Sequence, residues 1–173
     1  MKKADKKLVV KYEDKEVIEL KPFGLAASLE PHRPVMIFKS LCEKYTAGVP
    51  LSALEGGIMI SQSHQGNASS PHGLSLKALE AVGLQPVKCF FKEIRGSFLY
   101  VDVEFDGHEK ITRLTSRADE ALSFCMRAGA LFYSSLEMIQ KCKELEASHL
   151  QGYKVDALMG SIGTRENKHP YLM

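Results

Sequence analysis

The chain has 173 residues, of which 45% are hydrophobic and 25% are charged, the composition of an ordinary globular protein. As a single domain, a chain of this length buries roughly 70% of its extended-chain surface. The net charge of +2 gives no strong overall attraction for nucleic acid, although a local basic groove is compatible with it. No apolar run approaches the ~20 residues of a membrane helix, and the lysine-rich start does not resemble a signal peptide.

The four cysteines lie far apart and form no C-x-x-C motif. Cys125 and Cys142 fall on apolar stripes of expected helices, Cys89 falls in an expected strand, and Cys42 lies within the N-terminal third. This pattern predicts buried free thiols rather than disulfides or a metal site. Free thiols are typical of a reducing compartment, so we expect a cytoplasmic protein.

The N-terminal third has the short apolar runs of β-strands. Strands are expected at residues 8–12 and 16–21, around a polar turn, because apolar and polar residues alternate there. Further extended segments are expected at 23–28 and 34–38. After a polar, hairpin-like stretch, residues 49–51 return to the core.

Residues 55–72 form the least regular part of the sequence. Gly56 and Gly57 disfavour a helix there, although the apolar residues 58–60 favour burial. Pro71, with a serine before it, then introduces a helix that ends at Gly83.

Three strands at residues 86–94, 98–105 and 109–114, joined by glycine-containing turns, predict an antiparallel meander. Residues 115–147 follow as helix, short strand and helix. The capping-box pattern predicts that Ser116 and Asp119 begin the first helix, which ends at Gly129.

The second helix of this unit is expected to begin at Ser134, with Glu137 completing another capping box. The order of elements in the chain favours the α+β class: mixed or antiparallel sheets with a three-stranded meander and helices packed on one side. We divide the chain into an N-terminal strand extension (1–20), a domain (21–147) and a tail without periodicity (148–173). Exposed strand edges and residues 58–60 predict a homo-oligomer, most simply a dimer.

Three segments carry a family resemblance: SRADEALSFCMRAGALFYSS (116–135), SPHGLSLKALEAVG (70–83) and Val49-Pro50-Leu51. From about residue 21 to 147 the chain resembles the bifunctional nuclease (BFN) family. On that match His72, Arg117, Glu120 and Arg127 occupy family positions. The resemblance implies an α+β fold and a nuclease that acts on RNA and DNA.

The chain also departs from the family pattern. Ala118 and Asp119 replace a proline and a serine, Glu120 replaces an aspartate, and the family's tryptophan is missing. Gly57 stands where the family's next helix carries an acidic residue. Two functions follow: a nuclease, with Mg²⁺ or Mn²⁺ as its metal, or a non-catalytic binding or regulatory module that keeps the fold.

Catalytic roles are expected for His72, Arg117 and Glu120. Arg117 can contact a phosphate and Glu120 can hold a metal or orient the loop, at a helix start that favours anions. The alternative is that Asp119 caps the helix and Arg117 pairs with a nearby acid. His72 can serve as a general base or phosphate contact, and the alternative is an ordinary surface histidine.

Asp102 and Glu104 point the same way from one expected strand, which suits oxygen ligands of a metal. The alternative is a solvated sheet face on which Glu104 pairs with Lys110. Lys88 and Lys92, interleaved with Phe90, can neutralise and stack on RNA or DNA, and Arg127 joins them as a substrate-binding candidate through the family match. Alternatively, the lysines solubilise the strand and Phe90 is packed.

Overall fold

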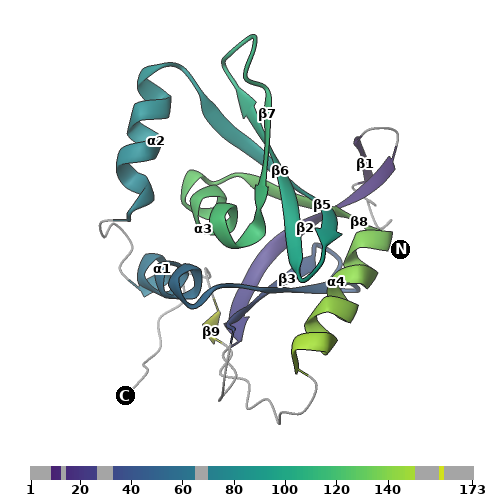
Figure 1. The fold of residues 1–173 in the computed structure, drawn as a ribbon. Helices are drawn as coiled ribbons and strands as arrows, with labels where there is room; N and C mark the ends of the chain where they lie inside the picture. The colour runs from purple at the N-terminus through teal and green to yellow at the C-terminus, as the bar shows by residue number, and fades with distance from the viewer. Residues whose placement is uncertain (1–8, 13–14, 27–32, 65–69, 151–159, 162–173) are drawn as a thin grey trace, which may run out of the picture.

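The computed structural model describes residues 9–12, 15–26, 33–64, 70–150 and 160–161 (Figure 1). Seven strands follow one path through a mixed sheet in the order β4-β3-β2-β8-β5-β6-β7, and β1 and β9 both pair with β2. The strands are β1 (Val9–Tyr12), β2 (Lys15–Ala26), β3 (Val35–Ser40), β4 (Thr46–Pro50), β5 (Gln85–Arg95), β6 (Phe98–Asp106), β7 (Arg113–Arg117), β8 (Leu131–Ser135) and β9 (Gly160–Ser161). The helices are α1 (Ala53–His64), α2 (His72–Ala81), α3 (Ala118–Ala128) and α4 (Leu136–Leu150). The expected α+β class is confirmed.

Strand β8 joins two antiparallel ribbons. It pairs with β2 in antiparallel register, with Leu20 opposite Phe132, and with β5 in parallel register, with Cys89 opposite the same phenylalanine. One ribbon is β4-β3-β2 and the other is the meander β5-β6-β7. The sheet is therefore continuous only because five residues of β8 lie between the ribbons.

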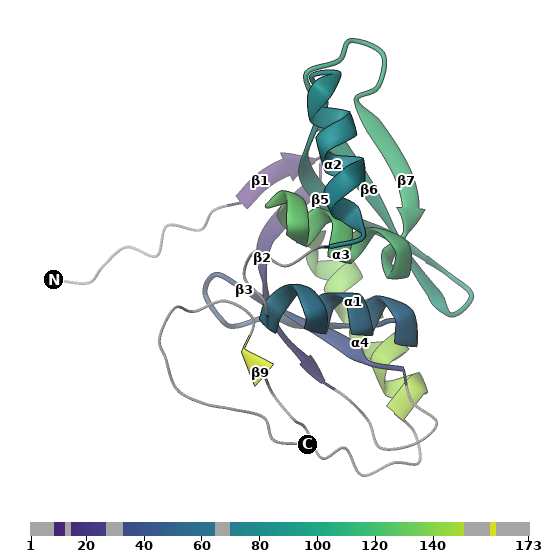
Figure 2. The ribbon, with the colours of Figure 1, turned by 90° about the vertical axis from the view of Figure 1, so that its left-hand side faces the viewer.

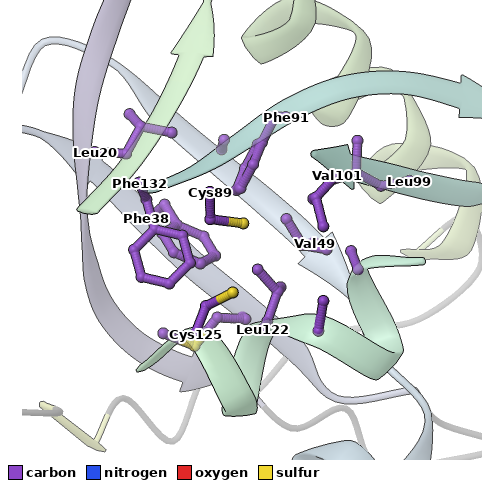
Figure 3. Close-up of a cluster of buried hydrophobic side chains, with 14 of the residues drawn as sticks. Leu20, Phe38, Val49, Cys89, Phe91, Leu99, Val101, Leu122, Cys125 and Phe132 are labelled. Atoms are coloured by element: carbon purple, nitrogen blue, oxygen red, sulfur yellow. The ribbon is translucent and has the colours of Figure 1, made fainter. Parts of the chain in front are cut away.

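The core lies between one face of this sheet and the helices α3 and α4. Phe38 packs edge-on against Phe91 and tilted against Phe132, with ring centroids 5.1 Å apart in both pairs. Leu122 and Cys125 of α3 meet these rings from the helix side (Figure 3). The apolar stripe of α3 therefore closes the core over the junction of the two ribbons.

Several local expectations are corrected. The third strand of the meander is Arg113–Arg117, later than the expected 109–114, so Ser116 lies in a strand and not at a helix start. Helix α3 begins at Ala118, and its N-cap residue is Arg117, whose side chain makes no capping hydrogen bond. Asp119 accepts a hydrogen bond from Arg117 and does not complete the expected capping box with Ser116. The end of α3 at Gly129, in the left-handed conformation (φ 74°), is as expected.

The cap of α4 is also displaced by one residue. Ser134 lies in β8, and Ser135 Oγ accepts the backbone N–H of Met138 at 3.1 Å. The helix continues to Leu150, past the expected domain boundary at residue 147. Most of the tail lies outside the described residues, but Gly160–Ser161 pairs with β2.

Helix α1 is the main element that the sequence did not indicate. It runs from Ala53 to His64, across Gly56 and Gly57. Ser52 Oγ accepts the backbone N–H of Glu55 at 3.1 Å, as an N-cap does. A Cβ at position 56 would lie 2.4 Å from Cγ of Pro34, whereas one at position 57 would meet nothing within 4 Å. Gly56 is therefore the glycine that lets α1 sit against Pro34.

The cysteines are free, as expected, and Cys89, Cys125 and Cys142 are buried, but Cys42 is exposed. Helix α2 begins after Pro71, as expected, yet none of its residues is buried. Among the helices that the structure describes, none is long and apolar enough to cross a membrane.

Candidate functional site

A buried carboxylate lies where α1 meets α3. Glu55 is only 3% exposed, and its Oε1 accepts the backbone N–H of Ser123 at 2.7 Å. Burial raises the pKa of Glu55, and the nearby charges of Asp119 and Glu120 act in the same direction, although hydrogen bonds from Ser123 oppose them. Glu55 therefore holds its proton more tightly than an ordinary glutamate does.

The histidine of α2 reaches the same serine. His72 Nε2 lies 2.7 Å from the hydroxyl of Ser123, which is fully buried, and the imidazole stands edge-on to Phe124 at 5.7 Å. Ser70 Oγ accepts the His72 backbone N–H and fixes the start of α2. Burial lowers the pKa of His72, so the ring is neutral at pH 7. Ser123 thus joins a buried acid on α1 to a neutral imidazole on α2.

Arg117 connects β7 to α3. Its Nε donates to Asp119 Oδ1 at 2.9 Å, and a second guanidinium nitrogen donates to Oδ2. The guanidinium stacks over Phe98 at 3.9 Å, and that of Arg33 lies 5.3 Å from the same ring. Two arginines on one phenyl ring present flat, charged surfaces of the kind that bind phosphates and bases.

Glu120 occupies the first turn of α3 and accepts a hydrogen bond from the Ser116 hydroxyl at 3.2 Å. The three expected catalytic residues therefore share one segment, residues 116–124. Arg117 and Glu120 belong to it, and His72 contacts it through Ser123. Helix α3, which carries most of this segment, packs against both α1 and α2 (Figure 2).

Asp102 lies on the opposite face of the sheet. It is fully buried, and its carboxylate accepts hydrogen bonds from Lys92 (3.0 Å), Tyr12 (3.0 Å) and Thr115 (2.5 Å), with Arg113 3.8 Å away. Burial alone would raise the pKa of Asp102, but these hydrogen bonds outweigh it and lower the pKa. Both carboxylate oxygens are therefore already engaged by protein donors.

Glu104, the other expected metal ligand, pairs with Arg113 at 3.3 Å and with Lys88 at 3.6 Å, and not with Lys110. These three side chains line a shallow hollow of about 530 Å³ on the outer face of the meander. Within the described ranges, no group of three or more His, Cys, Asp or Glu side chains is arranged to hold a metal ion.

The expected substrate-binding residues do not form one surface. Lys88 and Lys92 are paired with Glu104 and Asp102, and the intervening Phe90 is buried against Tyr12 and Tyr133. Arg127 lies in the last turn of α3, at the far end of the helix from Arg117. Phe90 thus follows the structural alternative, whereas each lysine forms an ion pair with an acid of β6 instead of only solubilising the strand.

Sequence reasoning missed four residues of the site, namely Arg33, Glu55, Phe98 and Ser123. The signal for Glu55 was available: a lone acid, three residues after a serine, inside an otherwise apolar stretch. The family resemblance directs attention to position 57, where this chain has glycine, whereas the helix carries its acid at position 55. The two arginines on Phe98 have no comparable signal, because Arg33 is distant in sequence.

No family model matches the chain, and no curated protein matches it either.

Proposed function

We propose that the chain is a nuclease that hydrolyses phosphodiester bonds of RNA or DNA at the segment 116–124. The observation that carries the proposal is the attachment of His72, Arg117 and Glu120 to that one segment. In this proposal His72, neutral at pH 7, takes the proton of the attacking hydroxyl or water. Arg117 and Arg33 contact the phosphate and stabilise the charge that develops on it.

A divalent ion, Mg²⁺ or Mn²⁺, forms part of the proposal. Glu120 supplies a carboxylate oxygen on the first turn of α3, whereas both oxygens of its neighbour Asp119 accept hydrogen bonds from Arg117. Mg²⁺ binds through one or two carboxylates and completes its shell with waters and substrate phosphates, so it needs no larger protein cluster. Burial of three free thiols supports the further proposal of a reducing, cytoplasmic location.

A second candidate is a non-catalytic module that binds nucleic acid. It is favoured by the pairing of Arg117 with Asp119 and the stacking on Phe98, since a preformed cation–aromatic surface binds bases and phosphates without any chemistry.

The two candidates separate when purified protein is incubated with labelled single-stranded RNA and DNA, with Mg²⁺, with Mn²⁺ and with EDTA. We expect cleavage with metal, a loss of about 100-fold or more in Glu120→Gln and Arg117→Lys, and a comparable loss in His72→Asn. Lys143→Gln, an exposed residue of α4, is the matched control.

Cleavage that survives EDTA would remove the metal from the proposal. Binding without cleavage would favour the second candidate. Unchanged rates in all three variants, each shown to be folded by circular dichroism, would place the chemistry elsewhere.

A further inference from the structure

The buried hydroxyl of Ser123 lies between an acid on one helix and an imidazole on another. Helix α3 carries Ser123, and α1 and α2 both pack against it (Figure 2). From α1, Glu55 accepts hydrogen bonds from the backbone N–H and from the hydroxyl of Ser123. From α2, Nε2 of His72 lies 2.7 Å from the same hydroxyl oxygen. Ser123 is fully buried and Glu55 almost so, and bulk water therefore has little access to these hydrogen bonds.

The single hydrogen of the Ser123 hydroxyl decides which nitrogen of His72 carries a proton. An ionised carboxylate accepts hydrogen bonds and donates none, so this hydrogen points to Glu55 when the acid is charged. The hydroxyl oxygen then accepts from His72, and Nε2 of the neutral ring holds the hydrogen. The lone pair of the ring is left on Nδ1, which has no hydrogen-bond partner among the described residues.

We propose that Glu55 and Ser123 are positioning residues, which hold the proton of neutral His72 on Nε2 and make Nδ1 the basic nitrogen of the site. This inference rests on the proposed function, in which His72 takes a proton from the attacking hydroxyl or water. The O–H bond breaks as an N–H bond forms at Nδ1, the ring becomes an imidazolium, and it later releases the proton to solvent.

The same chain of hydrogen bonds stabilises the imidazolium. Its Nε2–H still donates to Ser123, and the Ser123 hydroxyl still donates to the carboxylate of Glu55. The acid of a Ser-His-Asp triad acts in this way, since it selects the tautomer of the imidazole and stabilises its charged form. Here one serine hydroxyl lies between the acid and the ring.

A purely structural role of the two residues predicts something else. Glu55 and Ser123 also join α1 to α3. If they did no more than this, their replacement would lower the stability of the fold and leave the protonated nitrogen of His72 unchanged. The position of that proton therefore distinguishes the two roles.

Long-range NMR correlations between the ring nitrogens and the carbon-bound ring protons identify the protonated nitrogen of His72 in the full chain. The signals of this ring are assigned by their loss in His72→Asn. At about pH 8, where an ordinary histidine is neutral and an ordinary glutamate is charged, we expect the proton on Nε2. In Glu55→Met the Ser123 hydroxyl has no acid to donate to. It should then donate to Nε2, and the proton of the ring should move to Nδ1.

Two further variants test the chain of hydrogen bonds. Ser123→Ala removes the partner of Nε2, so both neutral forms of the ring should appear. Ser52→Ala is the matched control, because it removes the hydroxyl that accepts the Glu55 backbone N–H at 3.1 Å. This change weakens the start of α1 and leaves Glu55 and Ser123 in place, so the proton should stay on Nε2.

The cleavage assay gives a second readout. With RNA as substrate, kcat should fall by about 100-fold in Glu55→Met, because the lone pair is then on the wrong nitrogen. KM should change little, because Glu55 is buried and is not a phosphate contact in the proposed site. Ser52→Ala should cleave at the wild-type rate.

A proton on Nδ1 in the wild type would overturn the proposal, as would a proton that stays on Nε2 in folded Glu55→Met or stays entirely on Nε2 in Ser123→Ala. The wild type and Ser123→Ala carry this test if Glu55→Met does not fold. The NMR measurement needs no substrate, so its result is separate from that of the cleavage assay. The expected tautomers without cleavage would support the assigned proton positions and overturn the nuclease. An unchanged rate in folded Glu55→Met would support the nuclease and overturn the role of Glu55.

Discussion

Among the residues that the structure describes, two carboxylates are buried, and their surroundings are opposite. Asp102 lies among Lys92, Arg113 and hydroxyl donors, and its pKa is lowered. The carboxylate of Glu55 accepts a hydrogen bond from the neutral Ser123, with Asp119 and Glu120 nearby, and the pKa of Glu55 is raised by burial. Hydrogen bonds and ion pairs stabilise the charged form of Asp102, whereas burial destabilises the charged form of Glu55. A carboxylate whose charged form is stabilised contributes to the stability of the fold. A carboxylate whose charged form is destabilised is available for proton exchange.

The largest effect is expected from Asp102→Asn. The neutral amide leaves Lys92 without its buried counter-ion and cannot serve three donors as a carboxylate does, so the free energy of unfolding should fall by about 3 kcal/mol. Urea unfolding at neutral pH measures this. Because the pKa of Asp102 is lowered, its contribution is present above the ordinary value of 3.8 and is lost as the pH falls through the folded pKa.

Glu104→Gln provides the control on the same strand. Its side chain is 22% exposed, so its ion pairs with Lys88 and Arg113 are worth less than about 1 kcal/mol. Equal losses in the free energy of unfolding for Asp102→Asn and Glu104→Gln would show that Asp102 stabilises the fold no more than a surface acid does.

The next largest effect concerns the helix that carries Glu55. Gly56→Ala forces a methyl group against the ring of Pro34, and we expect a loss of about 2 kcal/mol in the free energy of unfolding. Gly57→Ala, one residue on, meets open space and should stabilise the helix by about 0.5–1 kcal/mol. Thermal unfolding measures the stability change in each variant. Changes of the same sign would argue against the close contact between Gly56 of α1 and Pro34.

The smallest effect should come from Glu55→Gln. Glutamine keeps an acceptor for the Ser123 N–H and removes the penalised charge, so stability near neutral pH should change by less than about 1 kcal/mol. The pH dependence is more informative than this value. With a raised pKa, native Glu55 binds its proton more tightly than the unfolded chain does. The wild type should therefore gain stability relative to the variant as the pH falls through the folded pKa toward 4.5.

Urea unfolding of both proteins at several pH values measures this difference. A wild type that loses stability relative to Glu55→Gln as the pH falls would show that Glu55 resembles Asp102, and the contrast between the two acids would be lost.

The sequence indicated β3, β5, β6 and the apolar stripe of α3 well, because each has a clear apolar pattern. The segments expected at 16–21 and 23–28 are instead the single strand β2, and β4 begins at Thr46, inside the stretch expected to be polar. The sequence did not indicate elements whose position depends on contacts between distant parts of the chain. The meander's last strand lies later than expected because Arg113 and Thr115 pair with Glu104 and Asp102, an attraction between strands that local pattern does not contain. Helix α1 forms despite two glycines because Gly56 fits against Pro34.

The candidate site was predictable in part for the same reason. His72, Arg117 and Glu120 were named through the family resemblance. In the structure Arg117 and Glu120 belong to the segment 116–124, and His72 of α2 contacts that segment through Ser123. Glu55 and Ser123 acquire their roles only through a contact between α1 and α3, which lie far apart in the chain. Lys92 was misjudged because its partner, Asp102, was expected to face solvent or metal.

The position of β8 has a consequence for the order of folding. The ribbons β4-β3-β2 and β5-β6-β7 are each made of neighbouring segments, which close short loops and can form early. Strand β8 must then bring Phe132 beside Leu20, near the other end of the described chain, and beside Cys89. Until that late step the two ribbons share no hydrogen bonds, and their facing strand edges are open to pairing with other chains.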